Sequence, residues 1–537
     1  MATQALNRTE FVSPIDEQKS PRLDEKQIGS LRHIGNLARQ LPNDWAHMMG
    51  PSYLGGDFAA FRYQLAFMAY ALGLAHFHRL PAAPGVFKQT FEKLIEKMMI
   101  PEVWYYWRDV SVGGGIFNHE AGLAEPQTDP IAKDNIMYSA YLQSMSLMYN
   151  VLFADDRYAQ PGALTLKFNP LFYHPIEGYN FEYDQNSINE RVYWNMVESG
   201  YLGVACEPNC VFQICNQPAI LGFRMHDLVN GGSRAAEVTE AYQKAWAEFG
   251  RLDSKGHYNM MMAQDTRAVR ENLGPSPWVD AWCGTLMNMW NREFVHEHYP
   301  SQIRDWLIES TDGAVSVRSA ARPEIMGQKV VNDDSDFGWA ATWASEMGDS
   351  STLQGLLTHA ERFMDPTWRN GGFYFPRNDM IEDAQGNRTL VEPMTGNVLL
   401  GYASLNVPDG LWKLYSEPWK PNHHSNPALV RVDDGIDVLQ ARFDEASRQL
   451  RFTLRPHAAS GDLGSKVVIG RLSSHGSWIL KCGNSIVARG VEGRVDLSSG
   501  SLEALATKEG VALSSPPECS SFVMQFESSS SSSVLGD

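Results

Sequence analysis

A short stretch, FKQTFEKLIEKM at residues 87–98, shows the pattern that decides most of the fold. Its apolar side chains, at positions 87, 91, 94, 95 and 98, recur as they do along one face of an α-helix. The same periodicity returns in further segments separated by turns rich in Gly, Pro and Asn: residues 23–41, 134–152, 187–203, 235–250, 278–290, 338–347 and 353–364. No strand pattern intervenes, so the sequence predicts about ten to twelve helices over residues 25–425, arranged as a toroid or bundle.

The pattern changes after the turn-rich residues 418–427. Leu439, Ala441 and Phe443 alternate with polar residues, as do Leu450, Phe452 and Leu454, and further short β-rich runs follow as far as Phe526. Such runs predict a small antiparallel β-sandwich over residues 426–527. Residues 1–24 are polar and are expected to form a mobile arm, and the Ser-rich residues 528–537 a disordered tail.

Composition excludes several classes of function. The 537-residue chain carries a net charge of −18, which argues against binding nucleic acid or an anionic membrane through a basic surface. No apolar run is long enough to span a membrane, and the first residues lack the apolar segment of a secretory signal. Six cysteines in a chain of this length fit free thiols in a reducing compartment, so we expect a cytoplasmic protein.

Three of the six cysteines lie in VACEPNCVFQIC, residues 204–215. The spacing of Cys206, Cys210 and Cys215 matches no zinc motif, and a reducing compartment disfavours a disulfide. Buried thiols that only fill space are one remaining explanation. Because Pro208 disfavours helical geometry at Glu207, a helix ending near residue 203 should stop there. The loop would then allow Cys206 and Cys215 to converge for acid–base or nucleophilic chemistry, with Cys210 left as a packing or solvent-facing residue.

The segment ACEPN at residues 205–209, followed by Cys215-Asn216, resembles the signature of the linalool dehydratase/isomerase family. Two further motifs support the resemblance: GGDFAAFRYQLAFMAY at residues 55–70, which contains Asp57 and Tyr63, and KDNIMYS at residues 133–139, which contains Met137. One position departs from the family pattern. The active-site histidine of the family falls at Tyr141, and a phenol is a far weaker base than imidazole near pH 7.

The resemblance implies an (α/α)6 barrel over roughly residues 25–420 and a reaction that uses no cofactor and no metal. Cys206 and Cys215 would flank the reacting carbons, and Asp57 and Tyr63 would hold or protonate the substrate hydroxyl. Met137 would line the apolar pocket, together with Phe212 and Tyr141. The resemblance also implies a homo-oligomer, a pentamer, whose sites take Asp57 and Tyr63 from an adjacent subunit.

Trp278 and Trp282 lie four residues apart and therefore share one face of a predicted helix. Paired aromatic residues at this spacing are typical of a core, and they would also form a wall that steadies a developing allylic cation. Taken together, these features predict a lyase or isomerase that dehydrates or isomerises an allylic alcohol of isoprenoid or related secondary-metabolite character.

Two other functions remain open at this point. The same pocket would serve a cyclase of secondary metabolism whose product has the same mass as its substrate, because no water is lost overall. Helical toroids also occur in glycosidases, for which the sequence offers paired acids among Asp280, Asp333, Asp334 and Asp336. The aspartates at 333–336 are otherwise expected to be solvent-exposed or to cap a helix.

Overall fold

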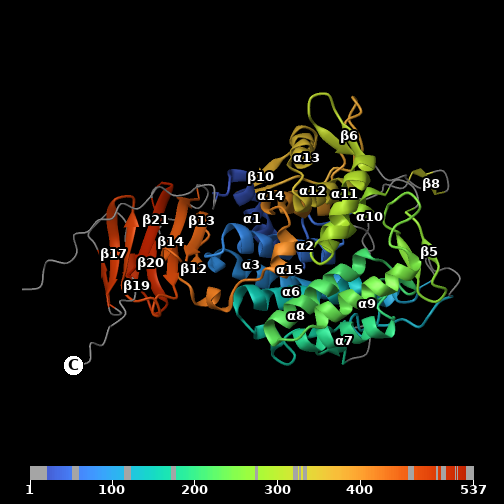
Figure 1. Ribbon diagram of the computed structural model, residues 1–537, viewed down its shortest axis with the longest axis horizontal. Helices are drawn as coiled ribbons and strands as arrows, with labels where there is room; N and C mark the ends of the chain where they lie inside the picture. The colour runs from blue at the N-terminus through green and yellow to red at the C-terminus, as the bar shows by residue number, and fades with distance from the viewer. Residues whose placement is uncertain are drawn as a thin grey trace, which may run out of the picture.

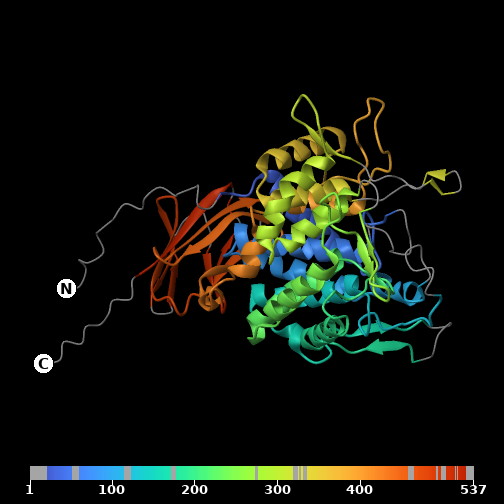
Figure 2. The ribbon, with the colours of Figure 1, turned by 45° about the vertical axis from the view of Figure 1, so that its right-hand side comes forward.

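The computed structural model describes residues 21–50, 60–113, 122–170, 177–272, 276–318, 324–325, 328–329, 335–457, 465–491, 494–497, 504–514, 516 and 518–527. The predicted tail lies outside these residues, as does the predicted arm except for residues 21–24. The structure consists of a helical part and a C-terminal β part, which lie side by side in both views (Figures 1 and 2). None of the described helices is long and apolar enough to cross a membrane.

Six helices form the inner ring of the helical part. Each contacts the next around the ring, and the last contacts the first. In order they are α2 (Phe61–Leu74), α6 (Ile136–Phe153), α8 (Gln217–Asn230), α10 (Pro277–Met287), α12 (Asp336–Met347) and α14 (Leu400–Leu405), the last preceded by the π-helical turn η6 (Thr395–Leu399). The fold is therefore the (α/α)6 arrangement.

A second set of helices alternates with the inner ones along the chain and packs outside them. These are α1 (Glu25–Ala38), α3 (Pro84–Met98), α7 (Gln185–Glu198), α9 (Arg234–Phe249), α11 (Arg292–Trp306) and α13 (Ser350–Phe363). In α3 the five apolar positions of the opening stretch are all buried, which confirms the predicted face. Outer helices are amphipathic because one side contacts the ring and the other faces water.

The inner helices lack this one-sided pattern because they are covered on every side. Every residue of α6 except Val151 is buried, and so is every residue of α2 except Phe61. Predicted helix ends agree with the structure to within a few residues for most elements. The exception is α7, which ends at Glu198 and not near residue 203, because Gly200 adopts the left-handed conformation (φ 66°) that terminates helices.

The C-terminal part contains two antiparallel sheets. One runs in the order β12 (Ala428–Val432), β15 (Lys466–Gly470), β20 (Gly510–Ser514) and β19 (Ala504–Ala506). The other runs in the order β13 (Ile436–Asp444), β14 (Gln449–Pro456), β21 (Ser520–Phe526), β16 (Trp478–Cys482), β17 (Ser485–Val491) and β18 (Arg494–Leu497). Leu450, Phe452 and Leu454 of β14 are buried between them, as the alternation in the sequence predicted.

Backbone hydrogen bonds join the two parts directly. Leu429 N–H donates to Ala82 C=O at 2.8 Å, Ala82 N–H donates to Ala441 C=O at 3.2 Å, and Leu23 N–H donates to Leu439 C=O at 2.8 Å. Gly85, at the start of α3, lies so close to β12 that a Cβ there would be 2.6 Å from the backbone nitrogen of Arg431. The β part is therefore fused to the outer side of α1 and α3.

Candidate active site

The loop that carries the cysteines is held in shape by Asn216. Its Oδ1 accepts a hydrogen bond from Val204 N–H at 2.8 Å, and its Nδ2 donates to the carbonyls of Val204 at 3.1 Å and Phe212 at 3.0 Å. Gly203, with φ 126°, allows the chain to pass this amide, since a Cβ at 203 would lie 2.5 Å from Nδ2. The asparagine that follows Cys215 in the motif thus fixes the loop that contains Cys206.

Cys206 and Cys215 are both buried, and their thiols lie close enough for each to affect the pKa of the other. Cys215 belongs to the short 3₁₀ turn η5 (Ile214–Asn216), which contacts both α6 and α10. Burial raises the pKa of both thiols, and the hydrogen bond to Cys215 raises the pKa of Cys206 further. Both groups are therefore protonated near neutral pH, and the pair is a source of protons.

Cys210 differs from the other two because its backbone sets its position. Its N–H donates to Glu207 C=O at 2.9 Å and its C=O accepts from Cys206 N–H at 2.8 Å, which closes the turn around Pro208. Its strand, β3 (Cys210–Val211), pairs with β4 (Met261–Ala263). The buried thiol has a pKa raised to about 12 by burial. Cys210 thus packs inside the protein and does not face solvent.

Arg62 is a buried cation beside the thiols that the sequence analysis did not single out. It donates from Nη2 to the Tyr63 hydroxyl at 3.0 Å, and its guanidinium carbon lies 4.4 Å from the centroid of the Tyr63 ring and 4.1 Å from that of Tyr106. Tyr106 in turn donates to Asn135 Oδ1 at 2.5 Å. An arginine within a largely apolar helix could have indicated this site from the sequence, because arginine is almost never fully buried without partners.

Glu207 is the second group that the sequence analysis missed, although it lies within the cysteine motif. Burial raises the pKa of its carboxyl, while the charge of Arg62 and a hydrogen bond with Cys206 oppose that increase. Glu207, Cys206 and Cys215 therefore form a chain of adjacent protonatable groups, each of which affects the pKa of its neighbour. Such a group of side chains is suited to acid–base chemistry.

Aromatic side chains from four inner helices meet next to this chain. Tyr63 makes edge contacts with Tyr141 at 6.0 Å and with Trp282 at 5.5 Å, and Trp282 stacks on Trp339 at 4.6 Å. The Tyr141 hydroxyl is buried and has no hydrogen-bond partner within the described part of the chain. Because an unpaired buried hydroxyl is costly, this phenol is suited to meeting a polar group of a ligand.

The other predicted residues occupy less central places. Met137 is buried in the first turn of α6, and Phe212 is half-buried against the same core. Trp278 is half-buried at the start of α10 and meets the Trp282 ring at an angle of 61° and a centroid distance of 6.5 Å. Asp57 lies outside the described residues.

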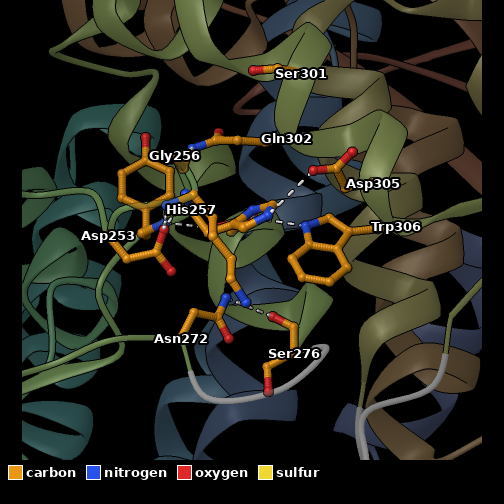
Figure 3. Close-up of polar contacts among 12 residues, drawn as sticks. Asp253, Gly256, His257, Asn272, Ser276, Ser301, Gln302, Asp305 and Trp306 are labelled. Atoms are coloured by element: carbon orange, nitrogen blue, oxygen red, sulfur yellow. Dashed lines mark hydrogen bonds and ion pairs between the residues drawn. The ribbon is translucent and has the colours of Figure 1, made fainter.

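Two of the acids considered for a glycosidase have structural partners. Asp280 is fully buried and accepts hydrogen bonds from His257 Nδ1 at 2.6 Å, Tyr258 N–H at 2.8 Å and Trp306 Nε1 at 2.7 Å. Figure 3 shows the His257 ring facing both Trp306 and Asp305, and Asp305 Oδ2 lies 3.4 Å from His257 Nε2.

The buried Asp336 accepts from Trp278 N–H at 2.7 Å, so it links α12 to the first turn of α10. Asp333 and Asp334 lie outside the described residues. Within the described ranges, no group of three or more His, Cys, Asp or Glu side chains is placed to hold a metal ion.

The loop, the thiol pair and the aromatic wall agree with the signature found in the sequence, and a comparison of the whole chain decides the family. The profile of linalool dehydratase/isomerase matches residues 62–381. The chain belongs to this family. The matched region contains Tyr63, Met137, Tyr141, Cys206 and Cys215, and all the inner helices except the last.

Several solved structures are similar in fold at low sequence identity. The GH76A α-1,6-mannanase from Salegentibacter sp. HEL1_6 has a TM-score of 0.40 and 11% identity, covering 70% of this chain and 98% of that one. Dfg5 from Chaetomium thermophilum, in complex with glucosamine, has a TM-score of 0.38 and 12% identity, covering 75% and 96%. Endoglucanase CelQ from Clostridium thermocellum has a TM-score of 0.34 and 10% identity, covering 94% and 93%.

Proposed function

We propose that this member of the linalool dehydratase/isomerase family is a lyase or isomerase that acts on an apolar, isoprenoid-like allylic alcohol without a cofactor. The observation that supports this most directly is the pair of adjacent, buried thiols of Cys206 and Cys215 beside an aromatic wall. A wall of this kind stabilises a substrate carbon that develops positive charge.

Dehydration requires one proton to be delivered and one to be removed. The C–O bond breaks as the hydroxyl takes a proton and leaves as water. A proton then leaves the neighbouring carbon, and its electron pair forms the new double bond. In this proposal the thiol that gives its proton to the hydroxyl becomes a thiolate, and that thiolate takes the proton from carbon. Isomerisation results when water instead adds to the other end of the allylic cation and the thiolate takes a proton from the added water, which restores the thiol.

The neighbouring residues have distinct roles in the proposal. Tyr63, which accepts a hydrogen bond from Arg62, holds the departing hydroxyl together with Asp57. Arg62 stabilises the transient thiolate of Cys206 by its charge, which already lowers the pKa of that thiol against the effect of burial. Glu207 shares the proton of Cys206. Tyr141, at the position of the family histidine, donates a hydrogen bond to substrate in place of acting as a base.

The three cysteines provide a matched test. Purified protein would be incubated with linalool and with longer allylic isoprenoid alcohols, and products would be separated by gas chromatography with mass detection. We expect a product lighter by one water or an isomeric alcohol, and Cys206→Ala or Cys215→Ala should lower the rate by about 10²–10⁴-fold. Cys210→Ala, which removes a buried thiol of the same loop, should remain close to wild type.

Three outcomes would count against this assignment. Cys206→Ala and Cys215→Ala proteins that stay folded and turn over at the wild-type rate would show that these cysteines are only core residues. A cyclic product of unchanged mass would identify a cyclase instead. Failure of the folded wild-type protein to convert any of these alcohols would exclude allylic isoprenoid alcohols as its substrates.

Two further features belong to the proposal. We infer a homo-oligomer, a pentamer by the family resemblance, whose sites are completed by Asp57 of an adjacent subunit. Tyr63, which the resemblance also assigned to the neighbour, lies beside Cys206 and Cys215 of its own subunit. We also place the protein in the cytoplasm, because all six cysteines are free thiols, as expected in a reducing compartment.

A further inference from the structure

A pocket of about 200 Å³ lies between the helical part and the β part, away from the thiols. From the helical side it is lined by Phe77, Trp419 and His423, and from the β side by Arg442, Phe443 and Arg471. Both halves of the protein therefore contribute side chains to it, and each supplies aromatic as well as cationic or titratable groups. Such a site exists only where the two parts are joined.

The two arginines of this pocket have no carboxylate partner within the described part of the chain. Salt bridges of that part involve other arginines, among them Arg431 with Asp433 and Arg455 with Asp437. Arg442 is exposed and Arg471 is half-buried. In a chain with a net charge of −18, two such guanidinium groups at one cavity are unusual, because an arginine normally finds an acid nearby.

The acid on this side of the junction is already satisfied by neutral groups. Glu445 accepts hydrogen bonds from Asn422 Nδ2 at 2.9 Å and from Asn426 Nδ2 at 3.1 Å. Asn426 also lines the pocket. The acid at the junction is thus satisfied by two carboxamides, and the guanidinium groups of Arg442 and Arg471 remain available to a ligand.

Three histidines lie near Arg471 and are uncharged. Burial lowers the pKa of His423 to about 3 and that of His76 to about 3, and it also lowers the pKa of His424. The charge of Arg471 lowers all three pKa values in the same direction. These imidazoles are therefore neutral at physiological pH, and the guanidinium groups are the positive charges of the pocket.

Unusual backbone geometry occurs on both sides of the pocket. Phe77 lies in a π-helical turn, η2 (Ala75–Arg79), that interrupts the end of α2. Arg471 has a left-handed backbone (φ 61°) immediately after β15. Both features cost free energy, and both are found preferentially at functional sites. They aim Phe77 and Arg471 at the same cavity.

We propose that this junction pocket binds a small anionic ligand, a carboxylate or phosphate carried on a single apolar ring. Arg442 and Arg471 would hold the oxyanion, since guanidinium groups pair with these anions through two parallel hydrogen bonds. Phe77, Trp419 and Phe443 would contact the ring. The cavity is smaller than the ~300–1,000 Å³ of sites for drug-sized ligands, which limits the occupant to about one ring.

Binding would be measured on the full-length protein by isothermal titration calorimetry with phenyl phosphate and benzoate. Phenol serves as the uncharged ring and inorganic phosphate as the anion without a ring. We expect at least one of the two anionic rings to bind, with phenol and inorganic phosphate weaker. Because a ligand that binds only the folded state stabilises it, the binding probe should also raise the melting temperature.

Arg442→Ala and Arg471→Gln should each weaken that binding by about 10–100-fold, as expected for loss of a charged hydrogen-bond donor. Arg489→Ala removes another exposed arginine of the β part, outside the pocket, and should leave binding unchanged. If Arg471→Gln does not fold, the exposed Arg442 decides the question alone. Absence of binding by both anionic rings, equal binding of phenol, or unchanged binding in Arg442→Ala would overturn the proposal.

Discussion

Replacing Asp280 by asparagine would test whether this acid has a structural role or a catalytic one. Its Oδ2 accepts hydrogen bonds from both His257 and Trp306, and its Oδ1 accepts from Tyr258 N–H. Asparagine has nearly the same shape but presents one NH₂ group where aspartate presents an oxygen. If its oxygen stays with His257 and Trp306, the NH₂ group opposes the N–H of Tyr258.

The loss of free energy can be worked out from these contacts. One buried donor left unsatisfied costs about 1–3 kcal/mol, and a hydrogen bond to a charged group contributes about 1.5–3 kcal/mol of stability. Part of this second contribution is retained in the variant, because His257 can still donate a hydrogen bond as a neutral ring. We therefore expect Asp280→Asn to lower the free energy of unfolding by about 2–4 kcal/mol. Asp280→Ala, which leaves all three donors unpaired, should cost about 3–5 kcal/mol.

The effect should depend on pH with a defined sign. The hydrogen bond to Asp280 raises the pKa of His257, and this increase exceeds the effect of burial. A raised pKa stabilises the protein below the pKa of unfolded histidine, about 6.5, and the contribution disappears as pH rises through the folded value. The gap between wild type and Asp280→Asn should therefore be larger at about pH 6 than at about pH 9.

Urea unfolding followed by tryptophan fluorescence would measure this gap at both pH values. Asp305→Asn is the matched control, because it removes another carboxylate near His257, with Oδ2 3.4 Å from Nε2 of the ring. The Asp305 side chain is 61% exposed, so the control should cost less than about 1 kcal/mol. An Asp280→Asn protein as stable as wild type but without activity would refute the structural role and favour the glycosidase alternative.

Two other predictions concern the proposed site. Tyr141→Phe should leave the free energy of unfolding within about 1 kcal/mol of wild type or raise it, because the lost hydroxyl has no partner in the described structure. Thermal melts would measure this change in stability. Turnover should fall if the phenol contacts substrate. Mixing inactive Asp57→Ala subunits with inactive Cys215→Ala subunits should restore part of the activity, since some mixed sites combine two wild-type contributions, and no recovery in demonstrably mixed oligomers would exclude a shared site.

The sequence located helices of both layers but could not assign each helix to its layer, for a physical reason. Residues 87–98 form a clear apolar face because the other side of α3 meets water. The apolar residues at 134–152 located α6, but α2 and α6 are covered all round, so their position in the inner ring is not readable from periodicity alone. In the β part, the alternation at residues 450–454 was visible because Arg451 and Thr453 separate the apolar side chains, whereas residues 436–441 of β13 are all buried.

For the candidate site, the sequence predicted the region but not all of the chemistry. Motif spacing indicated Cys206 and Cys215, and the structure places their thiols in contact. The effect of Arg62 on Glu207 depends on the approach of α2 to a loop that is distant in the chain, which no local pattern encodes. The role of Pro208 was also overestimated, because Gly200 ends the preceding helix earlier.

The close fit between Gly85 and β12 has a consequence for the stability of the separated parts. A single methyl group at residue 85 would collide with the backbone of Arg431, and Ala82 exchanges backbone hydrogen bonds with both Leu429 and Ala441. Neither part therefore presents a self-sufficient surface at the junction. Deleting residues 428–527 would leave backbone groups of Leu23 and Ala82 without their partners, so the helical part alone should be less stable than the full chain.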